Sequence, residues 1–314
     1  MANSKPHLLL IATGGTIAGR ADSAQDNVGY RAELGAADLL AAVPALAGVP
    51  LRTVQLAQLD SKDMSHAVWQ ALVQLLAAEL VRDDVAGVVI THGTDTLEET
   101  AFFLQHVLAP TKPVVMTAAM RPATSLQADG PQNLLDAFTL AQTPGACGVL
   151  VVMGGQVHAG DEVRKVDGYR LQAFDSDPAG PVALVEEGRV LPLRPWPQGQ
   201  ALGAACCERP LADWPRVAWL TSHAGFDAAL VDAAVAAGFQ GLVLAGTGNG
   251  TLHAELEAAA ARAAAAGVSL RLSTRCASGR VVGALARSVP VSATHSAAQA
   301  RVALLLDLLL QPAR

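Results

Sequence analysis

Short apolar runs alternate along the first half of the chain with longer stretches in which apolar residues recur every three or four positions. The short runs are rich in Val, Ile and Leu, and glycine or polar residues follow each one, which is typical of buried strands. They are His7–Ala12, Gly87–Thr91, Pro113–Ala118 and Gly148–Met153. The longer stretches have the periodicity of amphipathic helices and are Ser65–Arg82, Thr96–Leu108 and Asn133–Ala141. This alternation predicts a parallel sheet with helices on both faces.

The pattern is interrupted between residues 188 and 213, where the stretch 191–200 is rich in Pro and Gly and has no periodicity. Such a stretch is typical of a linker between domains. After it we expect strands at Val217–Leu220, Gly241–Ala245 and Ser269–Leu272 and helices at Asp227–Ala237, His253–Ala266 and Ala297–Leu310. The sequence therefore predicts an α/β protein with a larger N-terminal domain over residues 1–190, a linker over 191–213 and a smaller C-terminal α/β domain over 214–314.

Composition narrows the classes of function. Of the 314 residues 51% are apolar, the net charge is −6, and no basic run occurs, so no nucleic-acid partner is expected. No apolar stretch reaches the roughly 18 residues of a membrane span, so no membrane association is expected. The first apolar run is too short for a signal-peptide core. The four cysteines show no CxxC spacing, which favours free thiols. Together these features predict a cytoplasmic protein.

Ligands of open parallel sheets bind at the carboxyl ends of the strands, so the residues after each predicted strand are the candidates for chemistry. The first strand is followed by Thr13–Thr16, whose two central glycines allow positive φ and a close approach of the backbone to a ligand. A dinucleotide site needs the spacing GxGxxG leading into a helix. Here a polar stretch, Asp22–Asn27, follows instead, which disfavours a nucleotide site.

The segment after the next strand, His92–Thr96, permits two interpretations. In the first, Asp95 or Thr96 caps the following helix, and one of the two glutamates behind them completes a capping box. In the second, the Thr94 hydroxyl, the Asp95 carboxylate and the helix N-terminus form a site. The carboxylate would then hold a substrate ammonium, and the helix start would stabilise a developing oxyanion. These residues alone do not decide between the two.

A threonine hydroxyl is a weak nucleophile unless a base takes its proton, and Lys, His and Tyr are the candidate bases. Lysine is rare in this chain and occurs only at Lys5, Lys62, Lys112 and Lys165. Lys165 follows the strand that ends near Met153. If Lys165 is buried beside Asp95, it can act as a base; the alternative is a solvated surface charge.

Several of these segments match the signatures of a known family. The chain resembles the bacterial-type L-asparaginases, the asparaginase/glutaminase amidohydrolases, in Ala12–Gly19 (ATGGTIAG) and in Gly87–Phe103 (GVVITHGTDTLEETAFF). Further matching stretches are Asp60–Met64, Lys112–Pro122, Ala128–Leu134 and Ala245–Gly250. Two signatures in register are highly specific, and the resemblance extends over nearly the whole chain.

The resemblance implies an amidohydrolase that converts L-asparagine to L-aspartate and ammonia without a metal or an organic cofactor. Thr16 would be the nucleophile that attacks the side-chain amide carbon and forms an acyl-enzyme. Tyr30, on a mobile loop that closes over the substrate, would assist this step. Thr94, Asp95 and Lys165 would form a second triad in which Lys165 accepts a proton.

The resemblance also implies the substrate contacts and the assembly. Ser61 and Asp95 would hold the α-carboxylate and the α-ammonium of the substrate, and Ala119 would offer its carbonyl near the leaving amide. The other implied substrate-binding residues are Gly15, Thr94 and Asn249. The family is usually a homotetramer, a dimer of dimers, in which a neighbour's smaller domain completes each site. Asn249 is the expected contribution of that neighbour.

The pocket for the substrate's amino group departs from the family pattern. Relatives often carry Gln or Glu where this chain has Lys62, and many place a glutamate in the loop that corresponds to Cys276–Ala284, which here contains no carboxylate. Either Lys62 points to solvent, or the amino group is held by Asp95 alone. We expect weak turnover of glutamine, because the longer substrate is less well anchored without that carboxylate.

Three alternative functions make different demands on the sequence. An amino-acid sensor on a retained hydrolase fold predicts the loss of Thr16, Thr94, Asp95 or Lys165, and all four are present. An archaeal tRNA-amidotransferase subunit is disfavoured because it needs an additional domain before Thr16. A glutaminase-asparaginase of broad specificity is the main alternative.

Overall fold

The computed structural model describes residues 6–283, 289–292 and 296–312. The chain forms two compact units, Met1–Ala204 and Ala205–Arg314, and each is described by itself. The border between them lies within the stretch 191–213 that we expect to be a linker. Ala284, the last residue of the loop without carboxylates, lies outside the described residues.

The first unit is built around an eight-stranded sheet with the strand order β12-β11-β8-β7-β6-β5-β1-β4. Its centre consists of the four strands predicted from the sequence, which are β1 (His7–Gly14), β5 (Val85–Thr91), β6 (Pro113–Thr117) and β7 (Gly148–Met153). These strands pair in parallel, and nearly all of their residues are buried. The predicted parallel sheet is therefore confirmed, with antiparallel strands added at one edge.

Four strands of this sheet have no counterpart in the sequence prediction. β4 (Leu51–Leu59) pairs in parallel with β1 at one edge, and none of its residues is fully buried, so it lacks a continuous apolar run. β8 (Gln156–Ala159), β11 (Ala183–Glu186) and β12 (Arg189–Pro192) pair antiparallel at the other edge. Such short strands contain too few residues to show a clear periodicity.

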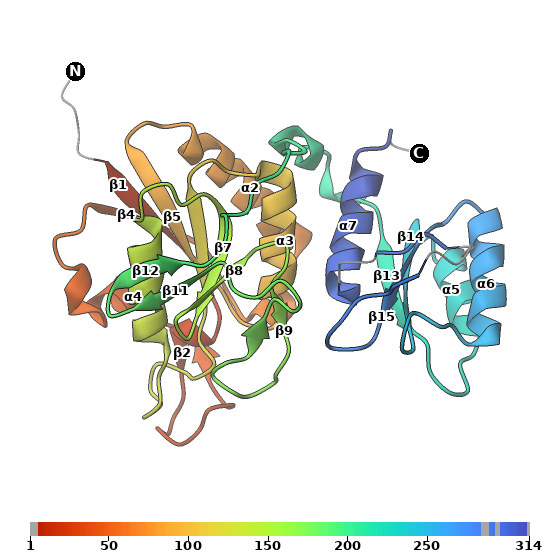
Figure 1. The fold of residues 1–314 in the computed structure, drawn as a ribbon, viewed down its shortest axis with the longest axis horizontal. Coiled ribbons are helices and arrows are strands. Elements are labelled where there is room, and N and C mark those ends of the chain that lie inside the picture. Colours follow the sequence, from red (N-terminus) through yellow and green to blue (C-terminus); the bar gives the residue numbers. More distant parts are fainter. Residues whose placement is uncertain (1–5, 284–288, 293–295, 313–314) are drawn as a thin grey trace. The chain divides into compact units, whose positions relative to one another are not determined.

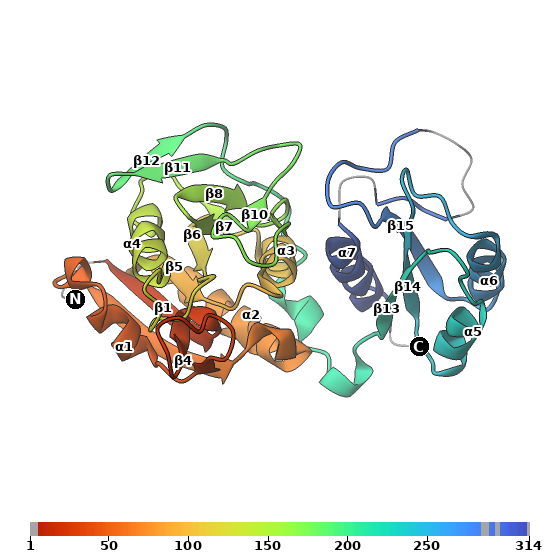
Figure 2. The ribbon, with the colours of Figure 1, turned by 90° about the horizontal axis from the view of Figure 1, so that it is seen from below.

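Helices cover both faces of the sheet, as the alternation predicts (Figure 2). α2 (His66–Leu80) and α3 (Leu97–Leu108) pack on one face, and α1 (Ala36–Ala41) and α4 (Gly130–Ala141) pack on the other. α4 begins before the predicted Asn133, because a proline is tolerated in the first turn of a helix.

The second unit is a smaller α/β structure. Its three strands are parallel in the order β13-β14-β15, with β13 at Val217–Thr221, β14 at Gly241–Gly246 and β15 at Ser269–Thr274. α5 (Ala229–Ala236) and α6 (Ala254–Ala265) cover one face, and α7 (Ala297–Leu309) covers the other (Figure 1). Each of these six elements matches a predicted one, so the fold class of this unit is confirmed.

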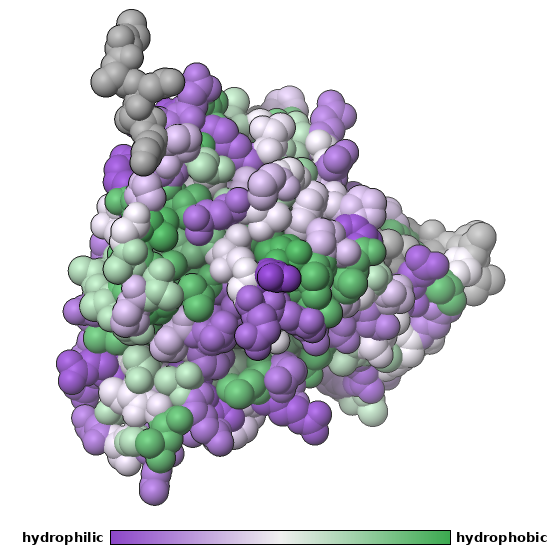
Figure 3. Space-filling model, turned by 60° about the vertical axis from the view of Figure 1, so that its left-hand side comes forward, coloured by the Kyte–Doolittle hydropathy of each residue, from purple (hydrophilic) through white to green (hydrophobic). Residues whose placement is uncertain are grey.

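Some large apolar residues are exposed at the surface of the first unit. Among the residues that the structure describes, no helix is both long and apolar enough to cross a membrane. On the face drawn in Figure 3, hydrophilic and hydrophobic side chains are interspersed. Val28, Leu126 and Leu193 are examples of large apolar residues exposed on loops of the first unit. Scattered exposure of this kind is normal on a protein surface.

Candidate active site

The turn after β1 brings Thr16 against the segment that follows β5. Gly14 and Gly15 have φ of 104° and 82°, so both adopt the left-handed conformation that favours glycine. A Cβ atom on Gly15 would lie 2.4 Å from the Cα of Gly93. Gly15 therefore lets the end of β1 touch the segment after β5, and Gly14 lets it touch the backbone of Leu59 at the end of the neighbouring strand β4. Thr16, which begins a 3-10 helix at Thr16–Ala18, is buried directly after this turn.

The hydroxyl of Thr16 is paired with a tyrosine. Its Oγ1 lies 2.6 Å from the phenol oxygen of Tyr30, within hydrogen-bond distance. Tyr30 ends the loop 21–30, which connects β2 (Gly19–Arg20) to β3 (Arg31–Ala32). Burial raises the pKa of Tyr30 above its usual value. The phenol is therefore neutral near pH 7, and it can accept a hydrogen bond from the Thr16 hydroxyl while it donates its own hydrogen to another group.

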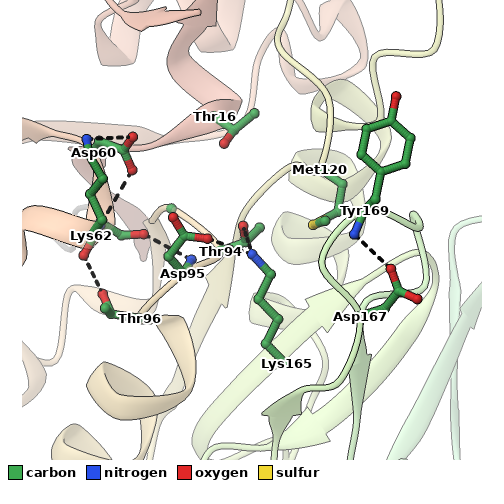
Figure 4. Close-up of polar contacts among 12 residues, drawn as sticks. Thr16, Asp60, Lys62, Thr94, Asp95, Thr96, Met120, Lys165, Asp167 and Tyr169 are labelled. Carbon is green, nitrogen blue, oxygen red and sulfur yellow. Dashed lines mark hydrogen bonds and ion pairs between the residues drawn. The ribbon is translucent and has the colours of Figure 1, made fainter. Parts of the chain in front are cut away.

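A second hydroxyl, that of Thr94, is paired with a lysine. The Nζ of Lys165 lies 2.9 Å from Oγ1 of Thr94 and 2.6 Å from Oδ1 of Asp95. The Lys165 side chain is 17% exposed, so of the two alternatives the structure shows a largely buried lysine beside Asp95. Figure 4 shows Lys165 extending toward Thr94 and Asp95, with Thr16 on the opposite side of the site.

Ser61 holds the start of α3. Its Oγ accepts a hydrogen bond from the backbone N–H of Asp95 at 3.1 Å, and its carbonyl accepts one from the hydroxyl of Thr96 at 2.8 Å. Thr96 occupies the N-cap position of α3 but makes no side-chain cap hydrogen bond. The capping-box interpretation is therefore wrong for this helix. Thr96 is used to connect two loops, and the Asp95 carboxylate is left to face Lys165.

Lys62 points to solvent. Its Nζ lies 3.1 Å from Oδ2 of Asp60 and 3.2 Å from Oδ2 of Asp63, and its side chain is 61% exposed. Both carboxylates raise the pKa of Lys62 above its usual value. The first of the two alternatives for this residue is thus the one observed, and the neighbouring aspartates offset its charge.

His92 precedes the Thr94 segment but is not available as a base. Its Nδ1 lies 2.7 Å from the carbonyl of Gly93, and its Nε2 lies 3.0 Å from the hydroxyl of Thr100. The side chain is fully buried, and this burial lowers the pKa of His92 to about 4. The imidazole is therefore neutral in the working range of most enzymes and serves to hold its own loop.

The loop after β6 is fixed by two residues of the family-matching stretch Ala128–Leu134, for which no role is expected from the sequence. The carboxylate of Asp129 accepts hydrogen bonds from the backbone N–H groups of Met120 and Arg121 at 3.0 and 2.9 Å. Asn133 donates to the carbonyl of Ala118 at 3.0 Å. These contacts hold the main chain on both sides of Ala119. Their signals in the sequence are the family-matching stretch that contains them and the polar character of Asp129 and Asn133 near the start of a helix.

Asn249 lies in the second unit, on the exposed loop after β14. Its side-chain amide donates to the carbonyl of Val282 at 2.8 Å and accepts from the backbone N–H of the same residue at 2.7 Å. Asn249 therefore connects two loops within its own unit. Of the site residues expected from the sequence, Gly15, Thr16, Tyr30, Ser61, Thr94, Asp95, Ala119 and Lys165 all belong to the first unit.

Known proteins are similar to this chain over both of its units. Residues 7–197 match the family description "Asparaginase, N-terminal", and residues 216–312 match "Glutaminase/Asparaginase C-terminal domain". L-asparaginase 2 of Escherichia coli is 36% identical over 277 residues, which are 87% of this chain and 79% of that protein. The glutaminase-asparaginase of Pseudomonas fluorescens is 34% identical over 254 residues, which are 80% of this chain and 70% of that protein.

A solved structure is similar over almost the whole chain. It is the crystal structure of a probable cytoplasmic L-asparaginase from Campylobacter jejuni, which is 30% identical and covers 98% of this chain and 96% of its own, with a TM-score of 0.88. Fold and site thus define a two-unit α/β enzyme with hydroxyl side chains at adjoining strand ends. The chain belongs to the asparaginase family.

Proposed function

We propose that this enzyme hydrolyses the side-chain amide of L-asparagine to L-aspartate and ammonia. The observation that carries the proposal is the presence of two paired hydroxyls, Thr16 with Tyr30 and Thr94 with Lys165, on neighbouring loops. Two similar proteins support this substrate, because they are named L-asparaginase 2 and probable cytoplasmic L-asparaginase.

In the proposed first half-reaction, Oγ1 of Thr16 forms a bond to the amide carbon while the C–N bond breaks. The hydroxyl proton passes through the phenol of Tyr30 to the leaving nitrogen, which departs as ammonia and leaves an ester on Thr16. In the second half-reaction, water attacks this ester, aspartate leaves, and Oγ1 regains its proton. In its neutral amine form Lys165, held at Thr94 and Asp95, would accept the proton that the attacking water loses and pass it on to Oγ1 as the ester bond breaks.

The substrate contacts follow from the same loops. The hydroxyl of Ser61 accepts from the Asp95 N–H, so its own hydrogen is free to be donated to an α-carboxylate. The carboxylate of Asp95 would hold the α-ammonium. Gly15 donates its N–H to the carbonyl of Leu59, so its contribution is the space left by its missing side chain. Ala119 would direct its carbonyl toward the leaving amide.

The proposal is tested by measuring ammonia release from L-asparagine, L-glutamine and their D-isomers. We expect release from L-asparagine with stoichiometric aspartate. A second measurement addresses the acyl-enzyme: rapid acid quenching followed by mass spectrometry should show one aspartyl group attached to the peptide that contains Thr16. Absence of ammonia release from every amide would contradict the proposed function.

Glutamine is expected to be a poor substrate. Lys62 is held by two aspartates, and the loop from Cys276 to Ala284 carries no carboxylate, so the longer substrate has fewer anchors for its amino group. We expect kcat/KM for L-glutamine to be about tenfold or more below that for L-asparagine, since one methylene group contributes differences of this size. Steady-state kinetics that give comparable values would instead favour a glutaminase-asparaginase, the name carried by the Pseudomonas relative.

We further propose a homotetramer in which Asn249 of a neighbour completes each site. Light scattering measures the size of the assembly. Mixing inactive Thr16→Ala subunits with Asn249→Ala subunits then tests the sharing of residues. If Asn249 acts across an interface, a mixed assembly contains sites with both residues intact and regains activity. No regain after verified subunit exchange would place Asn249 outside the neighbour's site.

We also propose a cytoplasmic location. All four cysteines are free, which suits a reducing compartment, and the structural relative from Campylobacter jejuni is called a probable cytoplasmic L-asparaginase. Fractionation of the native host should recover the protein with cytoplasmic markers. Recovery with periplasmic or secreted markers would contradict this location.

A further inference from the structure

Glu98 lies close to the candidate site but has no place in the proposed reaction. It stands in the first turn of α3, three residues after Asp95, where a negative charge is favourable to the helix. Its Oε2 accepts a hydrogen bond at 3.1 Å from the backbone N–H of Lys165, a residue 67 positions further along the chain. Glu98 thus connects the start of α3 to the main chain that carries the candidate base.

The strand that carries Lys165 needs such a connection. Within the described residues β9 (Arg164–Lys165) pairs with β10 (Phe174–Asp175) alone, in a two-stranded ribbon separate from the large sheet. A two-stranded ribbon by itself is at best marginally stable in water. Arg164 is tied to the carbonyl of Asp177 within the same part of the chain. The Glu98 contact instead ties the ribbon to α3, the helix whose start positions Thr94 and Asp95.

We propose that Glu98 is a positioning residue that clamps the main chain of Lys165 to the first turn of α3 and so fixes Nζ against Thr94 and Asp95. The inference rests on the proposed role of Lys165 in the reaction. Glu98 acts through Lys165 and does not touch the substrate. Without the clamp the ribbon can move away from α3, and a displacement of about 1 Å at a reacting group is enough to lower a rate about a hundredfold.

The clamp depends on the charge of Glu98. Burial raises the pKa of this carboxyl to about 7, and the hydrogen bond from Lys165 opposes the shift. The charged groups that act on it are Glu99 on its own helix and Arg164 and Lys165 on β9. Above pH 7 the carboxylate of Glu98 is ionised and accepts a stronger, charge-assisted hydrogen bond from the Lys165 N–H. Its negative charge also stabilises the protonated side chain that Lys165 acquires when it acts as a base. The clamp is therefore tighter above pH 7, and kcat is expected to rise with pH through about 7.

Stability changes in the opposite direction. The folded-state pKa of Glu98, about 7, lies above its ordinary value of 4.5. Between these two values the folded protein keeps a proton that the unfolded chain releases, so the contribution of Glu98 to stability is lost as pH rises through about 7. A neutral residue at this position avoids that loss. Replacing Glu98 by a neutral residue can therefore raise the stability of the protein above pH 7 and at the same time lower its kcat.

The substitution Glu98→Gln is the central test, because its amide oxygen can still accept the Lys165 hydrogen bond but never ionises. At pH 8 we expect kcat about tenfold below wild type, the difference between a neutral and a charge-assisted hydrogen bond. At pH 6 the kcat of the variant should lie within about twofold of the wild-type value, and its KM should do so at both pH values. The inflection near pH 7 in the dependence of kcat on pH should vanish in the variant. The Tm of the variant should exceed that of wild type at pH 8. Glu99→Gln, which removes the same charge from the same turn, is the control. Because the charge of Glu99 contributes to the raised pKa of Glu98, this variant should keep the inflection in kcat and move it toward lower pH.

Two outcomes overturn the inference. One is a Glu98→Gln profile that keeps the wild-type inflection near pH 7; the other is the same loss of inflection in Glu99→Gln. Failure of the proposed function is distinguishable, because wild type itself would then release no ammonia. In that case hydrogen exchange at the Lys165 amide still tests the clamp: exchange should be faster in Glu98→Ala than in wild type, and equal rates would contradict it.

Discussion

Replacing Thr16 by alanine is expected to abolish ammonia release from L-asparagine while leaving the binding of L-aspartate intact. The substitution removes the oxygen that would attack the amide, and the partner phenol of Tyr30, 2.6 Å away, then has no hydroxyl to activate. Loss of a covalent nucleophile typically lowers kcat by roughly 10⁴-fold or more. Ammonia release and aspartate titration calorimetry on the same preparation measure the two effects separately.

Controls for this prediction come from the same turn. Thr16→Ser keeps the hydroxyl and should retain measurable activity. Thr13→Val removes a hydroxyl that donates to the carbonyl of Thr91 at 2.9 Å and has no part in the proposed reaction, so its effect should be within about tenfold. Full activity of Thr16→Ala would exclude Thr16 as the nucleophile and would make Thr94 the candidate nucleophile.

Replacing Lys165 by methionine should lower kcat by about 10²–10⁴-fold, the range that proton transfer by a positioned side chain contributes. Methionine fills a similar volume but leaves the Thr94 hydroxyl and the Asp95 carboxylate without the amino group that lies 2.9 and 2.6 Å from them. Substrate binding at Thr16 and Ser61 should change less than kcat, because neither residue contacts the Lys165 side chain through a hydrogen bond in the described structure. Stopped-flow and steady-state measurements of ammonia release test this expectation.

Lys112→Met is a matched control for the removal of one lysine. Lys112 precedes β6 and donates to the carbonyl of Arg82, so it lies at the amino end of the sheet strands, away from the loops that form the site. Its loss should change kcat by less than about twofold, as expected of an exposed surface substitution. A change below about tenfold in Lys165→Met would count against a second triad built on Thr94.

The sequence alone predicts the central strands and the hydroxyl residues that follow them, because both depend on short-range patterns along the chain. The central strands are buried on both faces, so their apolar runs are continuous, and the candidate hydroxyls directly follow two of them. β4, by contrast, lies at an edge with none of its residues fully buried, so its pattern resembles that of a loop. Tyr30 and Ser61 were found only through the family resemblance, because a single tyrosine or serine in a loop gives no physical signal.

The tertiary structure decided how the side chains were used. Thr96 looked like a helix cap, yet its hydroxyl donates to the carbonyl of Ser61, a partner 35 residues away. Lys165 could have been a surface charge, and Glu98 could have been an ordinary first-turn glutamate. In the folded chain Lys165 contacts Asp95, 70 positions away, and Glu98 accepts a hydrogen bond from Lys165, 67 positions away. These long-range contacts determine the environment of both side chains. Periodicity and glycine spacing are short-range properties written in the sequence itself. Hydrogen-bond partners and the pKa shifts caused by burial depend on which distant segments exclude water from a group, and only the folded chain determines that.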